Sequence, residues 1–409
     1  MAGAIRAALI GVSGFGRVHC ADLLRLDRAE IAIAGVTIRD ETRAPEEATA
    51  LRKAGAEVFS DYREMLASLD GRIDLCFIPT GIHLHERMTV DALAVGANVV
   101  VEKPAAATIG QVNRMRAAEA KAERFVAVGY QTMYAPETLL MKRAILDGTI
   151  GTLQAIKCRG LWPRHDPYYE KPWVGRIRDG ATWVLDSPFN NAFAHQLNMI
   201  AFLAGAELTR SAVLASMEAE LYRARDIETA DTATMRILTI DGVPLYMLVS
   251  HCPEERLDPE IVVRGSRGEI HWSPERVIIK RDGHVAEEVS CLAGTALRDT
   301  MLRAVLKRLE DPQSFICTLE IAAGQTLAAN GAHMSSEVHP VPKELVKRVQ
   351  DSAMRTVIAG LDGLIARAFF EEKLLSELAV PWAVAGKRIN LDPATVATAY
   401  PEAGQEERL

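Results

Sequence analysis

Short apolar runs alternate with helical patterns over residues 5–128. The apolar runs are rich in β-branched residues, and the segments between them carry apolar residues at helical spacing. Strands that alternate with helices predict βαβ units and a parallel sheet with right-handed crossovers. We therefore expect a doubly wound α/β domain over residues 1–129. The expected strands are Ala7–Val12, Ile31–Ile38, Glu57–Ser60, Ile73–Pro79, Asn98–Glu102 and Phe125–Val128, and the expected helices are Val18–Arg25, Ala44–Ala54, Tyr62–Ser68, Leu84–Val95 and Gly110–Glu123.

The pattern changes after Tyr130. Successive strand-like runs between residues 212 and 280 predict an antiparallel sheet, and the Asp241-Gly242 pair between two of them is a hairpin signal. Helices are expected at Thr138–Leu146 and Phe193–Leu203, and a strand at Leu153–Gly160. Residues 161–180 are rich in Trp, Tyr, Pro, Arg and Gly, which is typical of a long ordered loop over a site. Residues 130–340 are therefore expected to form an α+β domain with an open, mainly antiparallel sheet.

Helical patterns return towards the end of the chain. They cover Arg298–Leu309, Leu319–Asn330 and Lys343–Leu378, and Gly360 and Gly363 favour a break in the last of them. We expect residues 341–409 to form a helical C-terminal extension that either covers the sheet or extends an interface. The polar end, residues 401–409, is expected to fray.

Composition narrows the class of protein. The 409 residues include 49% hydrophobic and 25% charged residues, with a formal net charge of -7. That length is typical of two domains, and an acidic surface argues against nucleic acid as a partner. No stretch reaches the roughly 18 charge-free apolar residues of a membrane span, and no leader sequence is recognisable. The six cysteines lie at no metal-ligand spacing, so we expect a cytoplasmic protein with no bound metal and no membrane partner.

The first strand ends in a glycine-rich turn over residues 11–16. Gly11 permits a tight turn, and Gly16 lets the next helix pack close to the strand. Ser13 stands where the usual G-x-G-x-x-G pattern has its second glycine, but its side chain is small, and Gly14 adds freedom. The helix N-terminus would offer N–H groups and its positive dipole end to a pyrophosphate. The turn, with Phe15 at its tip, therefore predicts a Rossmann-type site for a nicotinamide dinucleotide; an ordinary glycine-containing loop is the alternative.

The end of the second strand bears on which dinucleotide binds. An acidic residue usually stands there and binds the adenosine ribose. Here the position is Ile38, and Arg39 follows, which suits the 2′-phosphate of NADP. Alternatively, Arg39 is a surface residue and Asp40 serves the ribose after a shift of register. The sequence leaves NAD and NADP open.

Two further segments carry a resemblance to a known family. They read Ile-Pro-Thr-Gly-Ile-His over residues 78–83 and Val-Val-Val-Glu-Lys-Pro over residues 99–104. Together with the glycine turn, this sequence resembles the glucose–fructose oxidoreductase / inositol dehydrogenase / rhizopine-catabolism (Gfo/Idh/MocA) family over residues 5 to about 335. The resemblance implies a Rossmann domain followed by an α/β domain with an open, mainly antiparallel sheet. It also implies that this sheet packs against another subunit, so we expect a homo-dimer or homo-tetramer.

Lys103 stands out on chemical grounds as well. It lies at the carboxyl end of a parallel strand, where open α/β sheets bind ligands, and the bond to Pro104 can be cis. A surface lysine is the alternative. The resemblance implies that Lys103 approaches both the nicotinamide and the reacting hydroxyl. A histidine near a helix start is otherwise more often a capping residue, and His85 matches the pattern less well than His83. The remaining cofactor-binding residues implied are Pro79, Thr80, His83 and Glu102.

A polar trio accompanies the expected helix Phe193–Leu203. Asn191, His195 and Asn198 have i, i+4, i+7 spacing and would share one face, where they need a partner or a site; a satisfied core histidine is the alternative. The resemblance implies Asp, His and Asp at these positions, with the histidine and lysine handling the proton of the substrate hydroxyl. Because Asn cannot take a proton, we expect His195 and Lys103 to be catalytic and the trio to bind substrate. The nearest acidic residue is Asp186.

Aromatic residues are frequent where the two domains meet and in the long loop. Sugar rings stack on aromatic faces, and their hydroxyls need hydrogen-bonding partners. We expect Tyr134 and Trp162 to contact substrate; an aromatic lid or interface without substrate contact is the alternative. The other candidates are Tyr130, Gln131, Arg164, His165, Tyr168, Tyr169, Trp173 and Arg176.

These features predict an NAD(P)-dependent oxidoreductase that acts on a sugar, polyol or related cyclic alcohol or ketone. A second hypothesis is a glycoside hydrolase or lyase that uses bound NAD transiently, with no net redox change. A third is a non-catalytic sensor that binds dinucleotide.

Overall fold

The computed structural model describes residues 4–401, and the chain forms two compact units. The first unit contains residues up to 106, 111–131 and 294–319, and the second contains 107–110, 132–293 and the residues from 320 onward. The predicted boundary near residue 130 lies close to the division at 131. Residues 294–319 were expected in the second domain but belong to the first unit, and the extension is part of the second unit.

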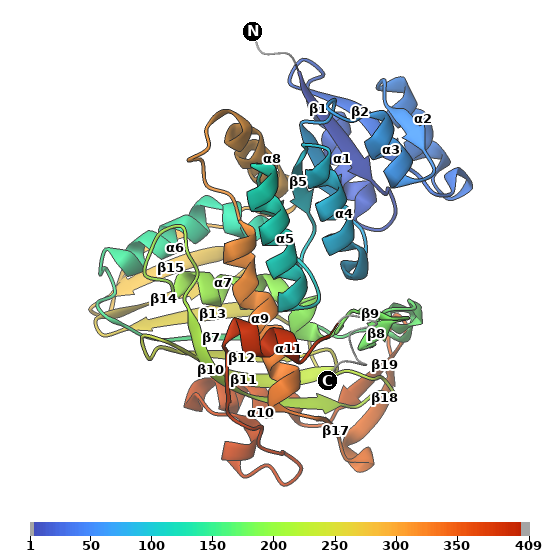
Figure 1. Ribbon diagram of the computed structural model, residues 1–409. Coiled ribbons are helices and arrows are strands. Elements are labelled where there is room, and N and C mark those ends of the chain that lie inside the picture. Colours follow the sequence, from blue (N-terminus) through green and yellow to red (C-terminus); the bar gives the residue numbers. More distant parts are fainter. Residues whose placement is uncertain (1–3, 402–409) are drawn as a thin grey trace. The chain divides into compact units, whose positions relative to one another are not determined.

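A six-stranded parallel sheet with the order β3-β2-β1-β4-β5-β6 forms the first unit (Figure 1). This is the strand order of a Rossmann fold, as the sequence predicts. The central strands are mostly apolar, apart from Arg6 in β1 and Asn98 at the start of β5, because helices cover both faces. The strands are β1 (Ile5–Ile10), β2 (Ile31–Thr37), β3 (Glu57–Phe59), β4 (Leu75–Ile78), β5 (Asn98–Val101) and β6 (Val126–Val128), and the helices are α1 (Gly16–Arg25), α2 (Pro45–Lys53), α3 (Tyr62–Ser68), α4 (Ile82–Ala94), α5 (Ile109–Ala122) and α8 (Gly294–Glu310).

Ion pairs and backbone bonds explain why residues 294–319 return to the first unit. Arg298 on α8 pairs with the buried carboxylate of Asp22 on α1, with 2.6 Å between Nε and Oδ2. The N–H of Val128 donates to the carbonyl of Cys317 at 2.8 Å, beside the edge strand β6. These contacts join residues far apart in the sequence, so local patterns could not place the segment.

The second unit is built on a ten-stranded sheet with the order β16-β15-β14-β13-β7-β12-β11-β10-β17, in which β20 also pairs with β10. Most neighbours are antiparallel, and the Asp241-Gly242 hairpin joins β11 to β12 as predicted. The exceptions are the parallel pairs β7–β12 and β10–β17. The strands are β7 (Leu153–Leu161), β10 (Leu214–Arg223), β11 (Thr232–Thr239), β12 (Pro244–Ser250), β13 (Leu257–Gly265), β14 (Gly268–Trp272), β15 (Arg276–Arg281), β16 (His284–Ser290), β17 (Val338–Pro340) and β20 (Ile389–Asn390).

Helix α7 (Ala194–Leu203) lies on one face of this sheet, against β7, β12 and β13. Its last carbonyls are bound by Lys142 of helix α6 (Pro136–Leu146), whose side chain is fully buried. The Lys142 ammonium donates to the carbonyls of Phe202 (2.6 Å) and Gly205, just past the helix end. Burial lowers the pKa of Lys142 to about 7. Helix α9 (Leu319–Ser335) follows further along the chain.

The extension begins with a hairpin, where the sequence predicted a helix over Lys343–Leu378. Strands β18 (Val346–Gln350) and β19 (Met354–Ile358) pair around a turn in which the Asp351 carboxylate accepts the N–H of Ala353. Val346, Val349 and Ile358 suit strands, and the helical reading of this part was wrong. Helix α10 (Leu361–Glu371) starts only after Gly360, which has φ +74°.

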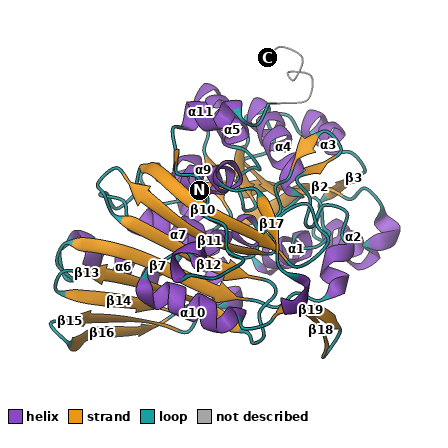
Figure 2. Ribbon diagram, turned by 90° about the horizontal axis from the view of Figure 1, so that it is seen from below, coloured by secondary structure: helices purple, strands orange, loops and turns teal. Residues whose placement is uncertain are grey.

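Helix α10 covers the face of the sheet opposite to α7 (Figure 2). Ile365 and Phe369 share a buried stripe with Leu361 and Ala368, and the stripe packs on Leu161, Tyr246 and Leu248 together with the short helix η6 (Leu375–Leu378). Of the two roles considered for the extension, covering the sheet is confirmed. The broad exposed face expected for subunit packing is partly occupied by the chain itself.

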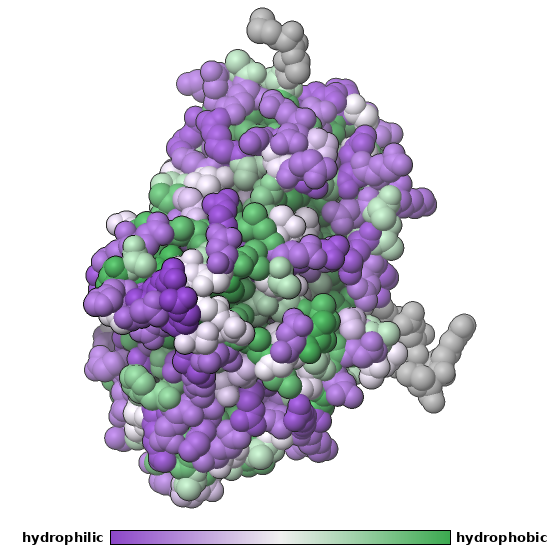
Figure 3. Space-filling model, turned by 90° about the vertical axis from the view of Figure 1, so that its left-hand side faces the viewer, coloured by the Kyte–Doolittle hydropathy of each residue, from purple (hydrophilic) through white to green (hydrophobic). Residues whose placement is uncertain are grey.

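No helix among residues 4–401 is both long enough and apolar enough to cross a membrane. On the side seen in Figure 3, hydrophilic residues cover most of the surface.

Candidate functional site

The glycine turn has the geometry of a phosphate cradle. Gly11 and Gly14 have φ +94° and +56°, the left-handed region that favours glycine. A Cβ on Gly16 would lie 2.6 Å from the carbonyl oxygen of Gly11, so this position admits only glycine without a shift of backbone. Ser13 and Phe15 are exposed at the tip, at the N-terminal end of α1. The turn presents bare backbone and a helix N-terminus, and this arrangement suits a bound anion.

The end of β4, with Pro79 and Thr80, lies against the turn. A Cβ on Gly16 would lie 3.4 Å from Cγ of Pro79, and a Cβ on Gly11 would lie 3.7 Å from Cγ2 of Thr80. His83, in the first turn of α4, places its ring beside Gly81. The structure therefore brings the glycine turn and the segment 79–83 together.

Lys103 follows β5 in a turn whose Lys103–Pro104 bond is cis. Before it, the buried carboxylate of Glu102 accepts a hydrogen bond from Nε2 of His19 at 2.8 Å and one from the N–H of Lys103 at 3.1 Å. Burial raises the pKa of Glu102, but the hydrogen bond and charge of His19 and the charge of Lys103 outweigh it and leave the pKa below the usual value. His19 belongs to α1, so the carboxylate ties Lys103 to the helix that begins at the glycine turn.

His85 ties the same turn to the end of β4. Its ring is buried, with Nδ1 2.9 Å from the carbonyl oxygen of Pro104 and Nε2 3.0 Å from that of Thr80. Burial lowers the pKa of His85, and the facing carbonyls oppose that shift. Sequence reasoning ranked His85 below His83 and did not single out His19. Both anchor the turn through contacts that no local motif reveals.

The end of β2 carries the residues that bear on the adenosine ribose. Ile38 is buried and its N–H donates to the carbonyl of Phe59. Arg39 is exposed, and the Asp40 carboxylate accepts from the N–H and hydroxyl of Thr42. An isoleucine therefore occupies the usual acid position in the structure too.

In the second unit, α7 carries His195 and Asn198 one turn apart, and the Asn198 side chain is fully buried. Asn191 lies outside the helix, in the stretch after the short helix η4 (Pro188–Asn190). The prediction that all three side chains share one helix face is wrong for Asn191. The helix begins at Ala194, next to the expected Phe193, and Pro188 and the Ser187 cap form a separate turn before it.

Asn191 is held by two side chains from the preceding segment. Its amide donates to the hydroxyl of Tyr168 at 2.9 Å and to Oδ1 of Asp186 at 3.0 Å. Asp186 is buried, and its other oxygen accepts the N–H of Gly175. The preceding Leu185 has φ +51°, which is costly for a side chain of this kind and is typical of functional sites. Asp186, the acidic residue nearest to the trio in sequence, therefore orients Asn191.

Trp162 joins this group through Phe193. The two rings are 4.8 Å apart, and the ring of His251 stacks on Phe193 at 5.8 Å. His251 also bonds the carbonyl of Trp162, and burial lowers its pKa to about 3, so it stays neutral. Tyr134 is buried at the end of the short helix η2 (Gln131–Tyr134). Sequence reasoning missed His251, which lies 56 positions from His195 in a strand-like run.

Two domains of one protein family match the chain. The model described as oxidoreductase family, NAD-binding Rossmann fold (GFO_IDH_MocA) matches residues 5–130, and the GFO/IDH/MocA C-terminal domain matches residues 138–271. Together they cover more than half of the chain.

Named relatives agree with this match. An inositol 2-dehydrogenase of Klebsiella pneumoniae is 28% identical over 203 residues, which are 49% of this chain and 54% of that protein. The chain thus spans about half the length of that relative. Inositol 2-dehydrogenase 1 of Saccharopolyspora erythraea is 25% identical over 67% of this chain and 77% of its own.

A solved structure shows the same fold. The WlbA dehydrogenase of Bordetella pertussis, solved with NADH and UDP-GlcNAcA, superposes with a TM-score of 0.65 at 21% identity, covering 81% of this chain and 97% of that one.

Proposed function

The chain belongs to the Gfo/Idh/MocA family, and on that premise we propose that it is an NAD(P)-dependent dehydrogenase acting on a CH–OH group of a sugar, polyol or related cyclic alcohol. The observation that carries the proposal is the anchoring of Lys103. His19 and His85 fix the turn at Lys103 to α1 and to the end of β4, both of which border the glycine turn. A lysine held this firmly beside a phosphate cradle is placed for chemistry at a bound dinucleotide.

The residues present fit a dinucleotide. Gly11, Ser13, Gly14, Phe15 and Gly16 would hold its pyrophosphate, and Gly16 has no room for a side chain. Pro79, Thr80, His83, Glu102 and Arg39 complete the set of cofactor residues that we propose. The bound nicotinamide supplies the hydride acceptor or donor. NAD and NADP stay open, because Ile38 stands at the acid position and Arg39 is exposed.

In this proposal Lys103 polarises the substrate oxygen, and His195 takes or returns the hydroxyl proton, since imidazole exchanges protons near neutral pH. Asn191 and Asn198 donate and accept hydrogen bonds to the hydroxyls of the substrate but move no proton. Asn191 is suited to this because Tyr168 and Asp186 fix its amide. Trp162 and Tyr134 supply the apolar surfaces that a sugar ring needs.

The substrate class rests on the relatives as well. Two named relatives are inositol 2-dehydrogenases, and a structural neighbour holds a UDP-sugar acid. Cyclitols and sugars, free or nucleotide-linked, are therefore the substrates to test first.

A panel of inositols, sugars, polyols and UDP-sugars with NAD+ and NADP+ tests the proposal, with absorbance at 340 nm and product analysis read together. We expect net reduction of one cofactor by a cyclic alcohol. Product formation without net reduction would favour a hydrolase or lyase instead. Cofactor binding with no turnover of any compound would favour a sensor.

A homo-dimer or homo-tetramer in the cytoplasm stays a prediction. We expected an oligomer because the open sheet would pack against another subunit. Helices α10 and η6 cover part of that sheet face, so the expectation now applies only to the part of the face that they leave uncovered. An oligomer would therefore use β14–β16, which lie outside this cluster, or another surface.

A further inference from the structure

The C-terminal extension touches the loop that carries Tyr168. His165 at the start of the short helix η3 (Asp166–Glu170) pairs with Arg355 of β19 in an isolated antiparallel bridge. The His165 ring meets the carboxylate of Asp351 in the β18–β19 turn, with 2.5 Å between Nε2 and Oδ1. The hairpin therefore lies directly against the start of this helix.

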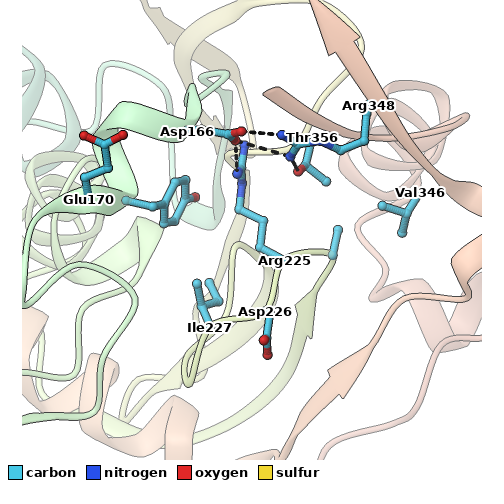
Figure 4. A pocket seen from close by; sticks show the side chains of 10 residues that line it. Asp166, Glu170, Arg225, Asp226, Ile227, Val346, Arg348 and Thr356 are labelled. Atoms are coloured by element: carbon cyan, nitrogen blue, oxygen red, sulfur yellow. Dashed lines mark hydrogen bonds and ion pairs between the residues drawn. The ribbon is translucent and has the colours of Figure 1, made fainter. Parts of the chain in front are cut away.

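The main link is a carboxylate between two guanidinium groups (Figure 4). Asp166 accepts from Arg225 at 2.7 Å and from both terminal nitrogens of Arg348. Arg348 is fixed in turn by a 2.6 Å bond to the hydroxyl of Thr356 across the hairpin. Because Arg348 and Arg225 both donate to it, the pKa of Asp166 falls to about 2 and the cluster keeps its charges at neutral pH.

Arg225 holds the same segment from the β10–β11 side. Its side chain is only 8% exposed, and its guanidinium lies over the ring of Tyr169 and donates to the carbonyl of Arg164. A cavity of about 430 Å3, lined by Tyr169, Arg225, Ile227 and Arg348 among others, lies beside the cluster. Polar contacts rather than continuous apolar packing therefore connect η3 to the hairpin.

Tyr168 stands within this held segment, where its hydroxyl contacts Asn191 and its ring contacts Tyr169. Its hydroxyl accepts the hydrogen bond from Asn191, and its ring meets that of Tyr169 edge-on at 5.3 Å. Further along the chain, beyond this segment, the indole N–H of Trp183 donates to the carbonyl of Pro401 at 2.9 Å.

We propose that the β18–β19 hairpin is part of the substrate site: Arg348 and Asp166 are positioning residues that fix η3, so that Tyr168 holds Asn191 in place for the substrate. This inference rests on the proposed function for the role of Asn191. It assigns a task to a segment beyond the two family domains, which end at residue 271.

The test compares Arg348→Met with Arg348→Lys, and with Arg276→Met as a matched control, because Arg276 is a similarly exposed arginine in one exposed ion pair. Trypsin cleavage after Arg164 and Arg176 reports the hold on the loop without any substrate. We expect Arg348→Met to be cut there about five times faster and Arg276→Met to be cut as the wild type is. Arg348→Lys should fall between these two, because its ammonium keeps the charge but not the two-nitrogen contact with Asp166.

Kinetics then test the link to substrate. We expect Arg348→Met to raise the KM for the substrate five- to tenfold, with kcat and the Kd for NADH nearly unchanged. This change in KM corresponds to the loss of about one charge-assisted contact. Tyr168→Phe should raise KM similarly without faster cleavage. Unchanged cleavage in Arg348→Met overturns the proposal, as does faster cleavage with unchanged KM. If the wild type turns over no compound, the proposed function fails, and the cleavage rates still decide whether the hairpin holds the loop.

Discussion

The buried pair Glu102–His19 makes the sharpest stability prediction. The Glu102 side chain accepts two hydrogen bonds, from His19 at 2.8 Å and from the N–H of Lys103 at 3.1 Å, and is 6% exposed. Glu102→Leu keeps most of the volume but leaves two buried donors without an acceptor, at about 1–3 kcal/mol each. Removing a buried carboxylate recovers part of this. The expected loss in the free energy of unfolding is about 3 kcal/mol.

Glu102→Gln separates charge from geometry. Its amide oxygen still accepts one of the two bonds, so we expect a loss of about 1 kcal/mol. Glu64→Leu is the matched control, because Glu64 is an exposed glutamate in the same unit and should change stability by less than about 0.5 kcal/mol. Urea unfolding followed by circular dichroism at pH 7 measures all three. A Glu102→Leu protein as stable as the control would refute the reasoning.

The same pair gives a pH dependence with a definite sign. The pKa of Glu102 is lower in the folded protein than its ordinary value of 4.5, so its stabilisation is present above pH 4.5. It is lost as the pH falls through the folded-state pKa. The wild type should therefore lose its advantage over Glu102→Gln in acid, and an advantage that grows below pH 4.5 would contradict the assigned shift.

Two further predictions concern the glycine turn and the buried lysine. Gly16→Ala should weaken NADH binding at least tenfold in a fluorescence titration, because its Cβ would meet the Gly11 carbonyl at 2.6 Å. Gly14→Ala is the comparison, because its Cβ meets no atom within 4 Å and it costs only about 1 kcal/mol of backbone strain. Equal affinities of the two variants for NADH would contradict the proposed pyrophosphate site. The pKa of Lys142 falls from 10.5 to about 7 on folding, so between these pH values the unfolded chain binds more protons than the folded one. The wild type should therefore gain stability relative to Lys142→Met as the pH rises from 7 to 10.5, by up to about 1.4 kcal/mol per pH unit. Urea midpoints at pH 7, 8.5 and 10 check this, and a constant difference would count against it.

Local patterns predicted β1–β6 and α1–α5 of the first unit well because these elements follow one another along the chain, unlike α8. Residues adjacent in sequence determine these features: the apolar runs at β4 and β5, the glycines at 11 and 16, and the bond before Pro104. The Asp241-Gly242 hairpin is equally local. These features need no knowledge of distant contacts.

The remainder depends on contacts between distant residues. Residues 346–358 form a hairpin that is anchored on Asp166. The spacing of the valines in this segment fits a helix as well as a strand, and only the contact with the distant Asp166 distinguishes the two. His19 and His85 gain their roles from Glu102 and Pro104 across the sheet. Asn191 lies outside the helix, where Tyr168 and Asp186 hold its amide. Neither contact can be predicted from the spacing of the polar trio.

The central proposal is that Lys103 polarises the oxygen of an alcohol and His195 takes its proton while a nicotinamide cofactor is reduced. The most direct measurement is kcat for cofactor reduction at 340 nm in Lys103→Met and His195→Asn, with the substrate that the panel identifies. Lys121→Met, which changes an exposed lysine of the same unit as Lys103, is the control. We predict a fall in kcat of about 10²–10⁴ for both variants, with cofactor affinity little changed and the control active. Wild-type turnover in either variant would contradict the account.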